Sequence, residues 1–108
     1  VYRRRKRSKY EIVYDILANC QNGAKKTWVM YRANLSYDLT VNYINDLVKR
    51  GLIENRDGLY YITDKGKQLL ELLGRWLKIN SESVALLNQI KQYLPDQEEN
   101  ETVVKPQN

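Results

Sequence analysis

The segment that decides the fold of this chain is Thr27–Thr63, TWVMYRANLSYDLTVNYINDLVKRGLIENRDGLYYIT. A hydroxyl side chain at a helix N-cap accepts a hydrogen bond from a backbone N–H group, and glycine favours the position just past a helix end. Thr27 and Ser36 therefore predict the starts of two helices, and Gly51 predicts the end of the second. The Asn-Leu pair at positions 34–35 lies between them, so the pattern predicts a helix-turn-helix.

Two apolar runs follow the second helix, Leu52–Glu54 and Leu59–Ile62, and they flank a turn at Asn55–Gly58. A glycine-containing turn between apolar runs predicts a β-hairpin. A helix-turn-helix followed by a hairpin is the layout of a winged-helix domain, in which the second helix can enter the major groove of DNA. We therefore expect a mainly α fold with a small β-wing.

The composition is that of one small folded domain with an appendage. The chain has 108 residues, of which 43% are apolar and 29% charged, and its net charge is +5. A positive balance favours a polyanionic partner. Histidine is absent and Cys20 is the one cysteine, which disfavours His-based catalysis, a Cys/His metal cluster and an intrachain disulfide. We expect no enzymatic activity, no catalytic or metal-binding residue, no cofactor, no small-molecule ligand, no membrane association and a cytoplasmic, nucleoid-associated location.

The charge and hydropathy patterns divide the chain into four parts. We expect a disordered basic arm at 1–9, a winged-helix domain at 10–63, a dimerisation helix at 64–95 and a disordered acidic and polar tail at 96–108. The arm contains six lysine or arginine residues. Each can displace a counterion from DNA, and such an arm can also read a minor groove.

A first helix is expected at residues 9–22, KYEIVYDILANCQN, with Gly23 closing it. Its apolar residues recur at the helical period and predict a face turned to the core. The residues of this face are Ile12, Val13, Ile16, Leu17 and Cys20. A short strand is expected in the loop before Thr27, where it would pair with the wing.

The helix after Ser36 is the candidate DNA reader. Asparagine can pair with adenine, and valine can contact a thymine methyl group. The exposed face has few cations, which fits backbone binding better than strong base readout; the alternative is a face of solvated polar residues only. Trp28 is interpreted as a lid over the core, and Arg56 as a wing-tip contact or a solvated turn residue. The candidate DNA-binding residues are Arg3, Arg4, Arg5, Lys6, Arg7, Lys25, Lys26, Arg32, Ser36, Tyr37, Asp38, Val41, Asn42, Asn45, Lys49 and Arg56.

A long final helix is expected between a cap at Thr63 and Pro95. Two overlapping heptad patterns form an apolar stripe too wide for solvent, which predicts a coiled coil with a second copy. The alternative is a break at 80–83 and a helical hairpin. Polar residues near the middle of the helix favour an antiparallel coil. The expected dimer-interface residues are Leu69, Leu72, Leu73, Trp76, Ile79, Asn80, Ser83, Leu86, Leu87, Ile90, Tyr93 and Leu94.

Three runs carry a resemblance to a known family: KYEIVYDIL at 9–17, YRANLSYDLTVNYINDLVKRGLIE at 31–54 and YYITDKGKQLLELL at 60–73. Over roughly residues 8–94 the chain resembles the archaeal "10a" type of small chromosomal DNA-binding protein. The resemblance implies a winged-helix domain, a C-terminal helix that dimerises as an antiparallel coiled coil, and a role in chromatin organisation or regulation. The chain departs from the family in its weakly charged reading helix, its longer arm and its polar mid-coil patch.

These observations predict a homodimeric, non-enzymatic winged-helix protein that binds double-stranded DNA with modest sequence preference. One alternative is a sequence-specific transcriptional regulator of a particular operator. Another, from a different class, is a protein-interaction module that does not bind DNA.

Overall fold

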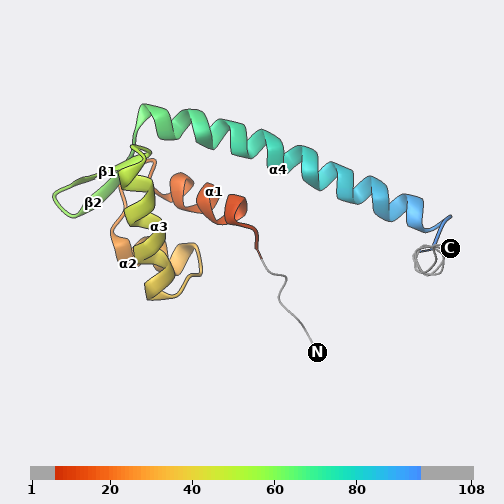
Figure 1. The fold of residues 1–108 in the computed structure, drawn as a ribbon, viewed down its shortest axis with the longest axis horizontal. Coiled ribbons are helices and arrows are strands. Elements are labelled where there is room, and N and C mark those ends of the chain that lie inside the picture. The colour runs from red at the N-terminus through yellow and green to blue at the C-terminus, as the bar shows by residue number, and fades with distance from the viewer. Residues whose placement is uncertain (1–6, 96–108) are drawn as a thin grey trace, which may run out of the picture. The chain divides into compact units, whose positions relative to one another are not determined.

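A computed structural model describes residues 7–95, and the predicted features at residues 1–6 and 96–108 lie outside the described residues. The elements in chain order are α1 (Lys9–Asn19), α2 (Lys26–Arg32), α3 (Tyr37–Lys49), β1 (Ile53–Arg56), β2 (Leu59–Ile62) and α4 (Asp64–Lys91) (Figure 1). The two strands form an antiparallel hairpin. The predicted fold class is confirmed: a helix-turn-helix, a β-wing and a long C-terminal helix.

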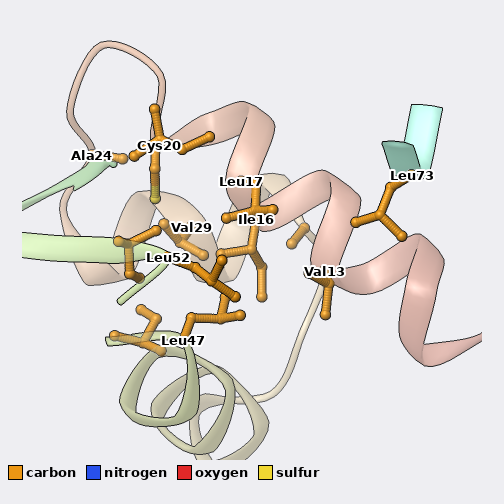
Figure 2. Packing of buried hydrophobic residues seen from close by; sticks show 13 residues of the cluster. Val13, Ile16, Leu17, Cys20, Ala24, Val29, Leu47, Leu52 and Leu73 are labelled. Carbon is orange, nitrogen blue, oxygen red and sulfur yellow. The ribbon is translucent and has the colours of Figure 1, made fainter. Parts of the chain in front are cut away.

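One hydrophobic core joins α1, α2, α3, the hairpin and the first turns of α4 (Figure 2). Ile16 and Leu17 of α1, Val29 of α2 and Ile44 of α3 are fully buried, and each such side chain stabilises the fold by about 1.5–3 kcal/mol. The buried hydroxyl of Thr40 donates to the Ser36 carbonyl oxygen at 2.8 Å, so this polar group has a hydrogen-bond partner.

Helix α1 begins at Lys9, as predicted for the first helix, although the predicted arm also extended to this residue. The side chain of Ser8 accepts from the Glu11 N–H while the Glu11 carboxylate accepts from the Ser8 N–H, a reciprocal capping box that fixes the helix start. The expectation of a disordered arm reaching residue 9 is therefore wrong for residues 7–9. The helix also ends before the predicted residue 22, with Cys20 as its C-cap.

The N-cap of α2 is Lys25, and the prediction of Thr27 as the cap is wrong. No side chain caps this helix. Ala24 forms an isolated antiparallel bridge with Tyr60 of β2, as expected of a short strand before the helix. The Ala24 N–H and C=O groups pair with Tyr60 at 3.0 and 2.8 Å. Because this bridge fixes the chain up to residue 24, the helix follows immediately.

The wing turn is tighter than predicted. Arg56 pairs with Leu59, so only Asp57 and Gly58 connect the strands. Both have positive φ, 53° and 86°, as a type I′ turn requires. The Asn55 side chain accepts from the Gly58 N–H at 3.0 Å. Asn55 and Arg56 are therefore strand residues rather than turn residues.

Helix α4 runs without interruption over 28 residues, which corresponds to about 42 Å. Thr63 caps it as predicted, since its hydroxyl accepts from the Gly66 N–H at 3.0 Å. The alternative of a break at 80–83 is wrong, because these positions are helical. Within residues 7–95, no helix combines the length and apolar character needed to cross a bilayer.

The described residues fall into two compact units, which divide between Arg75 and Trp76. The first turns of α4 belong to the winged-helix unit, because Leu69, Leu70 and Leu73 pack against its core. Leu73 is only 7% exposed. Leu73 is therefore a core residue of its own chain, which corrects its assignment to a dimer interface. Leu69 is half-buried against the same core, and its role in a dimer stays a prediction.

Candidate nucleic-acid interface

The turn between α2 and α3 is set by one residue in a left-handed conformation. Asn34 has φ 56°, which asparagine tolerates better than most residues. The Leu35 N–H donates back to the Met30 carbonyl at 2.9 Å. Ser36 then caps α3 by accepting from the Leu39 N–H at 3.2 Å. The helix-turn-helix is thus closed by local hydrogen bonds, as the sequence predicted.

Helix α3 has one face in the core and one face in solvent. Thr40, Ile44 and Leu47 are its buried residues. The opposite face is exposed, with Val41 half-buried at its edge. This arrangement agrees with the predicted periodicity and leaves several polar side chains available to a groove. The exposed members are Ser36, Tyr37, Asp38, Asn42, Asn45 and Lys49.

Arg50, at the C-terminal end of α3, is held by contacts within the protein. The Arg50 Nε donates to the Asp46 carboxylate at 2.9 Å. The Lys65 ammonium of α4 donates to the Arg50 carbonyl oxygen at 2.9 Å. Asp38 lies in the first turn, where a carboxylate is stabilised by the helix dipole. Helix α3 with its C-cap therefore carries no net charge, because Asp38 and Asp46 offset Lys49 and Arg50, as the sequence predicted.

The wing arginine is held between a carboxylate and an aromatic ring. Glu54 and Arg56 point to the same side of β1 because alternate residues of a strand share a face. Arg56 Nη2 lies 2.5 Å from the Glu54 carboxylate. Its guanidinium carbon lies 4.7 Å from the centre of the Tyr61 ring. The side chain is oriented, and part of its charge is neutralised.

Gly23 makes room for that ring. A Cβ atom built on Gly23 would lie 2.7 Å from the Tyr61 ring, and the residue has φ +89°. Both the left-handed backbone and the close approach require glycine. The loop after α1 thereby supports the wing residue that contacts Arg56.

A second cationic cluster lies on α2. The Lys25 ammonium is 5.7 Å, and the Arg32 guanidinium carbon 5.3 Å, from the centre of the Trp28 ring. Trp28 is 43% exposed, so it is not the core lid that the sequence suggested. Lys26, which was also predicted to bind DNA, follows Lys25 in the sequence and is half-buried.

Arg7 has a structural role that the sequence did not reveal. Its Nη1 donates to the Asp15 carboxylate at 2.9 Å. Its Nη2 donates to the Ala33 carbonyl oxygen, and to that of Asn34 at 3.1 Å. Arg7 therefore ties the segment just before α1 to the turn of the helix-turn-helix. Four predicted arm residues, Arg3, Arg4, Arg5 and Lys6, lie outside the described residues.

The exposed stripe on α4 contains most of the predicted dimer residues. The large apolar members that are exposed on α4 are Leu72, Trp76, Ile79, Leu86, Leu87 and Ile90. Asn80 and Ser83 are exposed with them. Val84 is a further exposed apolar residue of this helix, outside both predicted heptads. Tyr93 and Leu94 are also exposed but lie beyond Lys91, where α4 ends, so the predicted continuation of the helix to Pro95 is wrong.

Sequence reasoning missed three residues at the candidate interface: Glu54, Tyr61 and Trp28 in its contact with cations. The sequence held a signal for two of them, Glu54 and Trp28. Glu54 lies two positions before Arg56, so the two side chains share a face of the strand. Lys25, Trp28 and Arg32 are spaced at the helical period, so they share a face of the helix. The contact of Tyr61 with Gly23 joins distant positions, and no local pattern predicts it.

Comparison with known proteins gives the same architecture. The pattern of the family described as "Winged helix-turn-helix" matches residues 6–81. The uncharacterized protein MJ0290 of Methanocaldococcus jannaschii is 43% identical over 67 residues, 61% of this chain and 32% of its own length. This chain thus spans about a third of that relative. MJ0287 of the same organism is 36% identical over 72 residues, 66% of this chain and 74% of its own length.

A solved structure extends the likeness to the whole fold. Sso10a-2, a DNA-binding protein from Sulfolobus solfataricus, superposes with a TM-score of 0.73 at 32% identity. The match covers 82% of this chain and 97% of Sso10a-2. With a family pattern over most of its length and a relative matched almost end to end, this chain belongs to the winged helix-turn-helix family and to its 10a type.

Proposed function

We propose that this chain is a non-enzymatic, homodimeric protein that binds double-stranded DNA with modest sequence preference, in chromatin organisation or transcriptional regulation. One observation carries the proposal. The second helix of a helix-turn-helix exposes Asn42, Asn45 and Lys49 while its other face fills the core. That is the disposition with which such a helix enters a major groove.

The distribution of charge supports backbone binding as the main source of affinity. The net charge is +5, and the described cations near the helix-turn-helix include Lys25, Arg32 and Lys49. Phosphate contacts fix the register of a protein on DNA, whereas base contacts give specificity. The small number of cations on α3 favours a modest sequence preference. The relationship to Sso10a-2, a DNA-binding protein, supports the same assignment.

The experiment is a gel-shift series on a random duplex and on genomic fragments at several salt concentrations. With about 4–8 phosphates neutralised per domain, log K is expected to fall with log salt with a slope of about −4 to −7. A slope near zero would contradict nucleic-acid binding. A footprint confined to one site would indicate an operator-specific regulator, and a retained protein partner without any DNA shift would indicate an interaction module.

We propose that the second half of α4 forms an antiparallel coiled coil with a second copy. Six residues, Ile79, Glu82, Ser83, Leu86, Leu87 and Ile90, line one depression on this helix. Apolar side chains that follow both heptad patterns support burial against another helix. A dyad midway between Asn80 and Ser83 would pair these polar residues, place Ile79 opposite Val84 and place Trp76 opposite Leu87.

Spin labels distinguish the two orientations. A label at Glu71→Cys in a Cys20→Ala background would be about 30 Å from its copy in an antiparallel coil with this dyad. In a parallel coil the two labels would be separated by little more than the interaxial distance of about 10 Å. Leu86→Glu should give a monomer, whereas Lys78→Glu, an exposed charge reversal on the same helix, should leave the dimer intact. A monomeric wild-type chain would contradict the proposal.

A further inference from the structure

Helix α2 carries an exposed tryptophan with a cation on each side of it in the sequence. Lys25, Trp28 and Arg32 are spaced by three and four positions, so they share one face of the helix. Their contacts are cation–π interactions at 5.7 and 5.3 Å. Trp28 remains 43% exposed, so its ring lies at the protein surface rather than in the core.

The way in which Arg32 is held differs from that of other arginines in this domain. Arg7, Arg50 and Arg56 each form an ion pair with a carboxylate. Within residues 7–95, neither Lys25 nor Arg32 has a carboxylate partner among the ion pairs. An aromatic ring orients a cation without neutralising its charge. Both side chains therefore retain the full charge that a phosphate group requires.

We propose that Trp28 is a positioning residue that holds Lys25 and Arg32 as a paired phosphate-binding surface on α2. The inference rests on the proposed DNA binding and deepens it. In a helix-turn-helix the first helix crosses the DNA backbone while the second enters the groove. Lys25, Trp28 and Arg32 are exposed, whereas Val29 and Ala33 on the adjoining side are buried in the core. Its partner is the phosphodiester backbone, and its contribution is independent of base sequence.

The position of this surface relative to the core makes the proposal testable without unfolding the domain. Val29 and Ala33 supply the buried side of α2, so replacing the exposed Trp28 removes no core side chain. Tyr31 provides a matched control, because it is an exposed aromatic residue of the same helix. Within the described part of the chain, the cation–π contacts of α2 all involve Trp28 and not Tyr31.

The test compares Trp28→Leu, Trp28→Tyr and Tyr31→Leu with the wild type on random duplexes over a salt series. Trp28→Leu should weaken binding about three- to tenfold on every duplex and flatten the salt slope by up to about 2, one for each cation. Trp28→Tyr, which keeps an aromatic ring at this position, should retain much of the wild-type affinity and salt slope. Tyr31→Leu should change neither, and thermal unfolding should show all three variants folded.

A double-mutant cycle separates positioning from direct contact. In a Lys25→Ala/Arg32→Ala background, Trp28→Leu should have no further effect on affinity. An equal loss in that background would overturn the proposal, because Trp28 would then act without the two cations. An unchanged slope in Trp28→Leu would overturn it as well. Failure of the wild type to bind DNA would instead contradict the proposed function itself.

Discussion

Gly66 at the start of α4 lies directly against the backbone of Leu52: a Cβ atom built on Gly66 would be 2.1 Å from the Leu52 carbonyl oxygen. Around this contact, the Thr63 N–H donates to the same carbonyl at 3.1 Å. The Thr63 hydroxyl donates to the Gly51 carbonyl oxygen at 2.6 Å. The segment between α3 and β1, Gly51 and Leu52, is thus joined directly to the start of α4.

The first prediction is that Gly66→Ala destabilises the domain. The added methyl group meets backbone that cannot rotate away, so we expect a loss of about 2–4 kcal/mol in the free energy of unfolding, measured with urea. Gly74→Ala is the control in the same helix. The nearest atom to its Cβ would be the Tyr14 Cε1 at 3.3 Å, a side chain that can shift. A variant at Gly66 as stable as that at Gly74 would contradict the packing described.

The second prediction is that Glu54→Gln strengthens DNA binding. The Glu54 carboxylate neutralises part of the Arg56 charge and would itself repel phosphate. Its removal should raise affinity about three- to tenfold on all duplexes and steepen the salt slope by up to about 1. Glu71→Gln changes the net charge equally on an exposed part of α4 and should have a smaller effect. The gain should disappear in an Arg56→Ala background; a gain that persists there would exclude Arg56 as its source.

The third prediction separates reading from positioning on α3. Asn42→Ala should cost about 1–3 kcal/mol on preferred duplexes and little on others, if its amide pairs with a base. Lys49→Ala should weaken binding to all duplexes by a similar factor. The measurement is a selection from random sequence followed by titration of preferred and disfavoured duplexes. An Asn42→Ala variant with wild-type affinity for every duplex would rule out direct readout by this residue.

The fourth prediction distinguishes Arg7 from the rest of the basic arm. Arg7→Ala removes an ion pair to Asp15 and leaves carbonyl groups of Ala33 and Asn34 without this donor. We expect a loss of about 1–3 kcal/mol in the free energy of unfolding. Deletion of residues 1–6 should instead flatten the salt slope while the melting temperature stays unchanged. Loss of stability on that deletion, equal to the loss in Arg7→Ala, would contradict this division of roles.

The fifth prediction concerns pH. Burial raises the pKa of the Cys20 thiol from 9.0 to about 11. The unfolded chain releases this proton first, so the stabilisation is fully present below pH 9 and is lost as the pH approaches 11. Between pH 8 and 10 the wild type should lose about 1 kcal/mol more stability than Cys20→Ala. Urea titrations at both pH values check this; equal losses would show that the thiol ionises in the folded protein as it does in the unfolded one.

Local chemistry in the sequence was enough to predict the elements and the orientation of the reading helix. Ser36 and Thr63 act as caps because a hydroxyl group near the first backbone N–H groups of a helix needs no distant partner. The exposure of Asn42 and Asn45 follows from the helical period once Ile44 and Leu47 are assigned to the core. The long helix also follows from its own residues, since positions 80–83 are compatible with a helix and the structure continues through them.

Only the tertiary structure decided which cations are available to contact DNA and which apolar residues of α4 are available to a partner helix. Arg7 appeared in the sequence as one charge in a basic run, but it contacts Asp15, Ala33 and Asn34, which folding brings to it. Leu73 fitted a heptad, yet the core of its own chain buries it. The physical reason is the same for Arg7 and for Leu73. A periodic pattern fixes which face of a helix a residue occupies, whereas the groups that this face meets depend on segments far away in the chain.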